Sequence, residues 1–359
     1  MKKSLIALAV LAASGAAMAQ SSVTVFGVVD EAVQHVSNSG AGNSVTRLVS
    51  GGLSTSRIGF RGVEDLGGGL KAGFWLEAGI AADTGEGNVS GGAGSGLEFK
   101  RRATVSLLGN FGEVRLGRDF LASYNTLSSY DPFGDNGIGA IGFIYNRANP
   151  TGSTSGNGTF ENRKGNTIAY FLPSNLGGFF GQAQIIMGEQ TTGPKGNGFS
   201  IAGGYANGPL SVSGGYTKLY EGHAPTNKTV GNTADADSYN IGASYDFGVA
   251  KAMFVWNEEK LKVPTEVKFS SYLVGLTAPV GNGVAKISYQ DLDNKTSGFN
   301  GNDASKFSVG YVYNLSKRTA LYGTVAHISN DGGAAISLAG TAAAGKNSTG
   351  YEFGLRHSF

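Results

Sequence analysis

The strongest constraint on this chain is a regular alternation of apolar and polar residues, interrupted by connections of two very different lengths. From Val23 onward, segments of about ten residues carry apolar or aromatic side chains at every second position, with small or polar residues between them. This period of two predicts β-strands with one apolar and one polar face. We count sixteen such segments. Their connections alternate between roughly two to six and roughly ten to forty-five residues.

This pattern predicts an all-β fold, a 16-stranded antiparallel transmembrane β-barrel. Short turns at one end and long loops at the other are typical of outer-membrane barrels, whose strands of about 9–11 residues cross the bilayer at a tilt. A closed barrel satisfies every backbone group in lipid, and beyond residue 19 no apolar run approaches the ~20 residues of a membrane helix. A soluble sandwich or solenoid also contains many short strands, but it would have shorter and more even connections.

The first 19 residues have the features of a secretory signal peptide. Lys2 and Lys3 precede a short apolar run, and the small residues before Gln20 fit signal-peptidase cleavage after Ala19. A transmembrane helix is the alternative, but the apolar run is too short for one. We therefore expect residues 1–19 to be removed and residues 20–359 to form the barrel of an exported protein.

Composition narrows the chemistry. Without Lys2 and Lys3, two of the 28 lysines and arginines are lost, and the remainder equals the 26 aspartates and glutamates. A neutral chain gives no electrostatic case for nucleic acid. The absence of cysteine excludes disulfides and thiolate chemistry and fits a bacterial periplasm or outer membrane. The four histidines lie in unrelated segments without ligand spacing, so we predict no metal and no cofactor.

One connection, residues 121–164, differs from all the others in length and composition. A structureless segment this long is either functional or disordered, and aromatic residues such as Tyr124 and Tyr130 argue against disorder. Sixteen strands leave a lumen too wide for side chains to fill. We therefore expect this segment to fold into a water-filled lumen and narrow it. Its acidic residues Asp131 and Asp135 could then face arginines of the wall.

Several motifs together resemble a known family. They are the run SRIGFRGVEDLGGGLKAGFWLEAG from Ser56, the run GNFGEVRLGRDF from Gly109, the long third outer loop and the C-terminal Phe359. They resemble the general porins of Gram-negative bacteria, of the type found in Neisseria, Bordetella and Burkholderia. The resemblance covers the chain after the signal peptide. It implies a homotrimer in the outer membrane, in contact with lipid and lipopolysaccharide, that passes small hydrophilic solutes and ions by passive diffusion.

The resemblance also implies a constriction with two charged sides. Arg57 and Arg118 match the basic cluster of the family, and Arg61 lies on the same face as Arg57. Asp131 and Asp135 match the acidic side, which the third loop supplies. Strict alternation places Arg118 on the apolar face, so its inward position requires a bulge or bend. A turn role within the run DPFGDN is the alternative for the two aspartates, because Asp and Pro both favour turns.

Other charged residues are also expected to face the lumen, namely Lys71, Glu77 and Arg102. Where the family often has an arginine in its sixth strand, this chain has Ala169, so the basic cluster is thinner unless Arg163 or Lys164 substitutes. The arginine-rich wall favours anions weakly. For every one of these charges the alternative is a solvated lining residue without a part in selectivity.

Other functions have less support in the sequence. A G-x-G-x-x-G match at residues 137–142 lacks the preceding strand and following helix of a nucleotide site. A barrel enzyme of the lipase or protease type needs a nucleophile and a base, and the candidates His327 and Ser329 have no third partner. A structural adhesin would have a filled lumen and no conductance. We therefore predict a channel and not an enzyme.

The last strand, TGYEFGLRHSF, is expected to close the cylinder against the strand that begins at Val23. Its apolar set (Tyr351, Phe353 and Leu355) should face lipid, and its charged residues (Glu352 and Arg356) should face the lumen. Phe359 would lie at the membrane interface, where aromatic residues gather. In proteins that resemble this one, the terminal phenylalanine is the signal for the outer-membrane assembly machinery.

Overall fold

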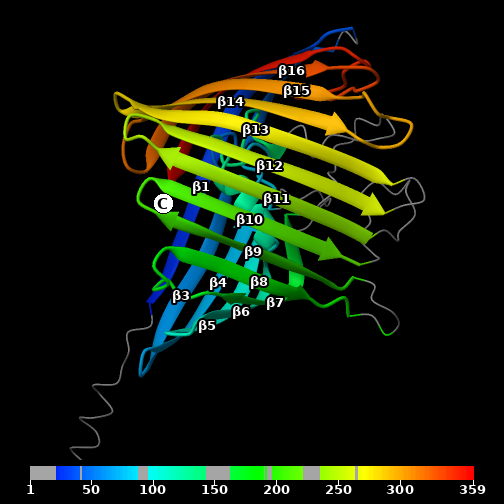
Figure 1. Cartoon of the computed structure of the whole chain (residues 1–359). Coiled ribbons are helices and arrows are strands. Elements are labelled where there is room, and N and C mark those ends of the chain that lie inside the picture. The colour runs from blue at the N-terminus through cyan, green and yellow to red at the C-terminus, as the bar shows by residue number, and fades with distance from the viewer. Residues whose placement is uncertain are drawn as a thin grey trace, which may run out of the picture.

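The strands of the chain form one closed barrel (Figure 1). The computed structural model describes residues 22–40, 43–87, 96–142, 162–189, 191, 196–220, 235–262 and 266–359. The predicted signal peptide and residues 143–161 of the long connection lie outside these ranges. Within the described part of the chain, no helix is both long enough and apolar enough to cross a membrane.

The described residues form one short helix, α2 (Ala122–Ser129), and a series of strands. The strands are β1 (Ser22–Asn38), β2 (Val45–Ser50), β3 (Arg57–Gly67), β4 (Leu70–Gly79), β5 (Arg102–Gly109), β6 (Gly112–Phe120), β7 (Arg163–Phe171), β8 (Phe179–Ile186), β9 (Gly198–Asn207), β10 (Leu210–Leu219), β11 (Asp235–Asp246), β12 (Lys251–Lys262), β13 (Val267–Val280), β14 (Gly283–Asn294), β15 (Ala304–Asn314), β16 (Thr319–Asn330) and β17 (Ser348–Ser358).

The barrel has sixteen strand positions, as predicted, although the described residues contain one strand more. Each strand from β3 to β17 pairs antiparallel with the next one along the chain. The long strand β1 closes the cylinder by pairing with β17 on one side. On its other side it pairs with β3 through residues 22–28 and with β2 through residues 31–36. The short strand β2 therefore extends the position of β3, within a stretch that the alternation pattern had not predicted as a strand.

The turn between β3 and β4 illustrates how glycine makes the short connections. Gly67, Gly68 and Gly69 all have positive φ, at 84°, 60° and 82°. Their Cα hydrogens face open space, and the Asp65 carboxylate accepts a hydrogen bond from the Gly67 N–H at 2.8 Å. Residues with a Cβ rarely adopt this backbone conformation, so the run GGG allows a tight hairpin at this end of the barrel.

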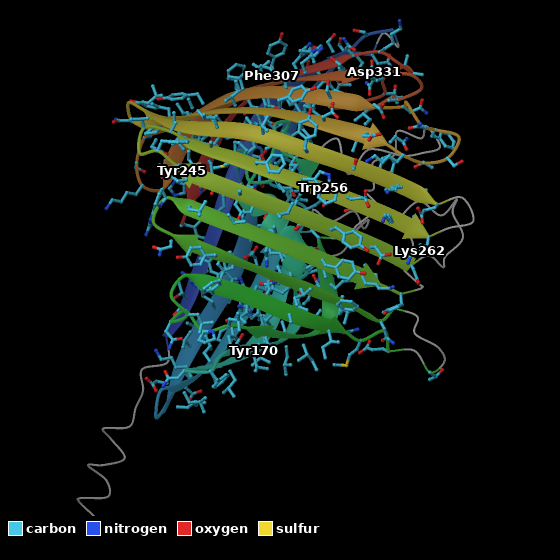
Figure 2. All side chains as sticks on the ribbon, in the orientation of Figure 1. Tyr170, Tyr245, Trp256, Lys262, Phe307 and Asp331 are labelled. Atoms are coloured by element: carbon cyan, nitrogen blue, oxygen red, sulfur yellow. The ribbon has the colours of Figure 1, made fainter. Side chains whose placement is uncertain are left out.

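The two faces of the wall have different side chains. Exposed apolar residues alternate along the strands, and Figure 2 shows Tyr170, Tyr245 and Phe307 pointing away from the cylinder. The opposite, inner face carries small and polar residues, many of them buried: Gln184, Ser200, Thr217, Asn240, Gln290 and Lys306. This arrangement is that of a membrane barrel, apolar toward lipid and polar inside.

The last strand closes the barrel in the predicted way. Leu355 of β17 lies opposite Glu31 of β1, and Phe353 is 64% exposed whereas Glu352 is 1% exposed. Phe359 and Gly27 exchange two backbone hydrogen bonds, of 3.0 and 3.1 Å. A Cβ on Gly27 would lie 2.3 Å from Cζ of the Phe359 ring. The glycine therefore makes room for the terminal ring at the seam between the first and last strands.

Candidate functional site

The segment that follows β6 packs along the inner face of the wall. Helix α2 contacts β9, β10 and β11, behind which it lies in Figure 1. The backbone N–H of Ala122 donates to Oε1 of Gln184 at 2.9 Å, and the Asn240 side-chain amide donates to the carbonyl of Ser123 at 2.8 Å. Polar side chains of the wall thus satisfy the polar groups of the first turn of the helix, which has no side-chain cap of its own.

Beyond α2, the segment rests on glycines of the wall. The Tyr130 hydroxyl is within 3.1 Å of Ser211 Oγ and 2.9 Å of Ser213 Oγ. Its ring lies over Gly242, where a Cβ would be 2.1 Å from Cδ2 of Tyr130. The same relation recurs between Gly275 and Pro132 and between Gly310 and Phe133. Glycines on three wall strands thus leave room for the segment to pack directly against the backbone of the wall.

The rest of the described segment continues around the wall to β14, β15 and the residues that precede β3. Gln290 donates to the carbonyl of Ile141 at 2.9 Å, and Lys306 Nζ donates to the carbonyl of Ala140. On the other side of the turn, Oδ1 of Asn136 accepts the backbone N–H and the hydroxyl of Thr55, both at 3.0 Å. Residues 121–142 therefore contact the barrel from β8 through β15 and the residues that precede β3.

The two predicted acidic residues lie inside this segment and bind its own backbone. The Asp131 carboxylate accepts hydrogen bonds from the N–H groups of Phe133, Asp135 and Ile141, at 2.8 to 2.9 Å. The Asp135 carboxylate accepts the Gly142 N–H at 3.0 Å and the Tyr124 hydroxyl at 2.7 Å. Burial raises the pKa of Asp135 to about 6, although the hydrogen bond from Tyr124 acts to lower this pKa. Both carboxylates thus hold the turn together, and Lys306 is their nearby cation.

Tyr124 connects the segment to an arginine group at the rim. The Tyr124 ring stacks on the Phe120 ring, with 4.8 Å between the two centroids. The Arg163 guanidinium lies over the Phe120 ring, 3.7 Å from its centroid. Burial and the neighbouring Asp135 raise the pKa of Tyr124 well above its usual value, whereas the charges of Arg163 and Arg101 act in the opposite direction. The hydroxyl is therefore a fixed donor to Asp135 and is not an acid at neutral pH.

The carboxylate of Glu77 binds Arg101, which precedes β5, and lies near Arg57 of β3. Arg101 Nε lies 2.7 Å from Oε1 of Glu77, and Arg57 Nε lies 3.8 Å from the same oxygen. The indole N–H of Trp75 donates to the other oxygen at 3.1 Å. Glu77 itself is 9% exposed. Two predicted residues, Arg57 and Glu77, are therefore brought together, and the acid between the arginines comes from the wall.

A second charged group lies on β5 and β6. Arg115 binds both oxygens of Glu113 at 2.8 and 2.9 Å, and its Nη1 lies 2.6 Å from Asp119 Oδ2. Arg102 lies 3.5 Å from the same Asp119 oxygen. Arg115 stands directly opposite Ala169, the position where an arginine was expected. A guanidinium is therefore present beside that alanine, supplied by the neighbouring strand.

Three further predicted residues lie apart from the Glu77 group. Arg61 is four residues from Arg57, which corresponds to about 13 Å of strand. Arg118 lies opposite Ala103, on the parity of the outward residues, and its Nε donates to the carbonyl of Lys100 at 2.6 Å. The pairing of β6 with β7 shifts register between Gly117 and Asp119. Lys71 is exposed near the short turn between β3 and β4.

Sequence reasoning missed Arg101, Arg115 and Lys306. Arg101 precedes the regular part of β5, so alternation gave its neighbour Arg102 the inward position. Arg115 had a usable signal, because it shares the parity of Glu113 in the run EVRLGR. Lys306 had none, since only the docked segment gives this lysine its carbonyl partner. In the described part of the chain, no cluster of His, Cys, Asp or Glu could hold a metal ion.

The whole chain is similar to known porins. A family model described as Gram-negative porin matches residues 5–333. Outer membrane porin protein 32 of Delftia acidovorans is 47% identical, with 100% of both chains covered. An outer membrane porin protein of Bordetella pertussis is 32% identical and covers 90% of this chain and 93% of its own length.

Solved structures give the same result. The anion-selective porin from Comamonas acidovorans superimposes with a TM-score of 0.81 at 41% identity, covering 95% of this chain and 100% of that one. OmpT of Vibrio cholerae, in its trimer form, has a TM-score of 0.65 at 15% identity and covers 94% of this chain and 99% of its own. The second match is a likeness of fold alone.

Proposed function

The chain belongs to the Gram-negative porin family, and from this premise we propose that its pore is narrowed by residues 121–142 and made anion-preferring by arginines of the wall. The protein is an outer-membrane porin for passive diffusion, a channel without enzymatic activity. Membership of the family leaves open which residues of this chain set the size limit and the charge preference of the channel.

The contacts of the segment support its role as the constriction. Its hydrogen bonds run along the inner face from Gln184 of β8 to Thr55 beside β3. A segment held at so many points occupies the lumen as a shelf of fixed position. Solutes then pass between this shelf and the inner face of β3–β6, and the width of that passage sets the size limit.

The observation that carries the charge preference is the excess of arginine on the inner face of β3–β6. Arg57, Arg61, Arg101, Arg102 and Arg115 lie there with Glu77, Glu113 and Asp119. These residues are five cations and three anions, and at the short-turn end Lys71 lies opposite Asp65, so the excess of positive charge stays at two. Low-dielectric walls strengthen the resulting positive field. In this proposal Asp131 and Asp135, whose oxygens bind backbone N–H groups, act mainly by holding the shape of the segment. Arg118 contributes at the long-loop rim.

Two similarities favour this sign of selectivity and a trimeric assembly. The related porin from Comamonas acidovorans is described as anion-selective. OmpT of Vibrio cholerae, which shares the fold, is described in a trimer form. On this chain, the outer face of β1 and β3–β6 presents exposed aliphatic side chains, among them Val25, Val33 and Val105. We propose that this face is covered by neighbouring copies in a homotrimer and that the remaining wall contacts lipid and lipopolysaccharide.

The ends of the chain serve export and assembly in this proposal. Residues 1–19 act as a signal peptide cleaved after Ala19, and Phe359 is the residue recognised by the assembly machinery. Deletion of Phe359 removes both that signal and the ring that covers Gly27. We expect about tenfold less folded protein in the outer membrane, measured by heat-modifiable mobility in gels. The channels that do assemble should keep their conductance, and a loss of conductance per channel would contradict this division of roles.

Planar-bilayer recording under a salt gradient tests the pore, its size and its sign together. We expect single-channel steps, in groups of three if the trimer is intact, and a reversal potential on the anion side. The double variant Arg57→Ala with Arg118→Ala removes one charge from the inner face and one from the long-loop rim. It should shift the reversal potential toward the cation side, with the anion-to-cation permeability ratio falling roughly several-fold. Absence of conductance, or an unchanged permeability ratio in a folded variant, would overturn the proposal.

A further inference from the structure

We propose that the inner face of β1 and β3–β6 holds a binding site for small monocarboxylates with an apolar body, anchored by Arg61. A cavity of about 410 Å³ opens there, toward the short turns from the Glu77 group. Among its lining residues are Thr24, Arg61, Val63, Trp75, Ser106 and Leu108. This volume is within the range of small-molecule sites, about 300–1,000 Å³. The inference rests on the proposed function, since the ligand reaches the cavity through the anion-preferring lumen.

The Arg61 guanidinium is held by aromatic rings. Its Cζ lies 5.2 Å from the Phe26 ring centroid and 5.1 Å from the Trp75 ring centroid. The two rings meet edge to face at 5.0 Å. A Cβ on Gly59 would lie 2.3 Å from Cζ of Phe26, so this glycine makes room for the first ring. Stacked in this way, the guanidinium is oriented but keeps its N–H groups available in the plane.

Arg61 differs from its neighbours in having no acidic partner. Arg115 is matched by Glu113 and Asp119, and Arg101 is matched by Glu77. In the described ranges, no ion pair includes Arg61, and its side chain is exposed. One guanidinium thus offers its fork of donors to a ligand, and a carboxylate matches that fork with two parallel hydrogen bonds. The cavity lining also contains Arg102 and Arg115, but Asp119 and Glu113 hold these two guanidinium groups. Arg61 is therefore the one lining cation without an acidic partner among the described ion pairs, and this favours a monoanion over a dianion.

The apolar part of the ligand is indicated by what surrounds Gly73. A Cβ at this position would meet Leu108 Cδ1 at 3.5 Å and Val63 Cγ2 at 3.8 Å. Gly73 therefore opens a shallow gap between two aliphatic side chains on the same face as Arg61. Val63 is 52% exposed on the polar face of the wall, which is unusual for valine there. A compact hydrocarbon body seated on Val63 and Leu108 removes this apolar surface from water.

The fluorescence of Trp75 gives a readout that does not depend on conductance. The chain contains two tryptophans, Trp75 and Trp256. Trp256 lies on β12, far from the cavity along the wall, so the variant Trp256→Phe leaves Trp75 as the reporter. We would titrate this protein, purified from outer membranes in detergent, with cyclohexanecarboxylate, acetate and succinate. We expect a saturable change with the first, and at least about tenfold weaker binding of the other two.

Three variants on the Trp256→Phe background assign the effect to Arg61. Arg61→Gln should weaken cyclohexanecarboxylate binding about tenfold, and Arg61→Lys should retain part of the affinity, because lysine keeps the charge without the planar fork. Lys71→Gln removes a charge from the same inner face outside the cavity lining and should change the affinity less than about twofold. Heat-modifiable mobility in gels checks that each variant is folded.

The outcomes separate this inference from the proposed function. A channel that conducts with anion preference but shows a non-saturable response, or equal binding of acetate or succinate, overturns the site and leaves the function in place. Unchanged affinity in Arg61→Gln also overturns it. A protein that binds cyclohexanecarboxylate saturably but passes no current keeps the site and refutes the anion channel.

Discussion

The two parts of the barrel wall, β1–β6 and β7–β17, are built from different residues. All 15 tyrosines of the chain lie at position 124 or beyond, so β1–β6 contain none, whereas exposed tyrosines recur along the outer face of β7–β17. Tyrosine suits a membrane interface because its ring is apolar and its hydroxyl is wet. The absence of tyrosine from one sector therefore indicates that this sector has a different environment from the other.

The inner faces differ as well. On β3–β6 the inner face carries arginines that are exposed or held by wall carboxylates, such as Arg61 and Arg101. On β10–β15 it carries glycines and polar residues on which the segment of residues 121–142 rests. Glycines on the inner face have a different role in each sector. Gly242 gives the segment its seat, while Gly73 leaves open space in the cavity. One sector is thus a surface for solutes and the other a support.

The largest expected effect comes from a charge placed on the outer face of each sector. Val105 on β5 and Ile241 on β11 are 54% and 51% exposed. If copies cover the first sector, Val105→Arg buries an unpaired charge in the trimer interface, and we expect trimers to be lost. Ile241→Arg faces lipid, so it should cost about 2–4 kcal/mol of barrel stability without changing the oligomer.

Native gels and analytical ultracentrifugation in detergent distinguish these results, with heat-modifiable mobility as the control for folding. Loss of trimers in Ile241→Arg and their retention in Val105→Arg would reverse the assignment of the two sectors. Equal retention of trimers in both variants would show that the tyrosine-free sector is not an interface.

A smaller effect is expected from one methyl group on the inner face of each sector. In Gly242→Ala the new Cβ would lie 2.1 Å from the Tyr130 ring, so the ring must move away from the wall. Overpacking of this kind costs about 1–3 kcal/mol, and the displaced segment should lower single-channel conductance about twofold. Gly73→Ala is the matched control, because its Cβ has contacts no closer than 3.5 Å.

Bilayer recording at fixed salt measures both variants. A conductance in Gly242→Ala equal to that of the unaltered protein would mean that the position of the segment does not limit the current. A change in Gly73→Ala as large as that in Gly242→Ala would remove the distinction between support and solute surface.

Strand number, closure and the direction of side chains were predictable because each follows from a local, repeated signal. The period of two placed Phe353 outward and Glu352 inward without any knowledge of the neighbours. The same rule put Glu77 and Arg57 on the inner face, and the structure adds that their side chains are neighbours. Alternation also put Arg118 on the outward parity, and the structure keeps it there opposite Ala103, although the pairing of β6 with β7 shifts register between Gly117 and Asp119.

The partners of the charges were not predictable, because they depend on how an irregular segment folds. For Asp131 and Asp135 the sequence offered two roles, facing arginines of the wall or holding the turn DPFGDN, and it could not decide between them. In the structure backbone N–H groups of the segment take up their oxygens. Arg101 was missed because it lies where strand alternation has not yet begun. Strand β2 was missed because its six residues are too few to show a clear period.

The smallest expected effect is a pH dependence confined to the supporting sector. Burial raises the pKa of Asp135 to about 6, above its ordinary value of 3.8. The docked segment is therefore favoured while this carboxyl is protonated, below about pH 4, and loses stability as the pH rises through about 6. Open-channel noise should grow by roughly a few tens of per cent over this range in the unaltered protein. In Asp135→Asn it should stay at the low level, because the amide cannot ionise.

Asp331→Asn, which changes an exposed carboxylate at the long-loop end (Figure 2), serves as the control and should follow the unaltered protein. Open-channel noise is recorded in bilayers between pH 4 and 8 for the unaltered protein and for both variants. A pH-dependent increase that persists in Asp135→Asn would trace the titration to a group other than Asp135. An increase abolished by both variants would indicate a response to overall charge, and the supporting sector would then have no pH-sensitive contact of its own.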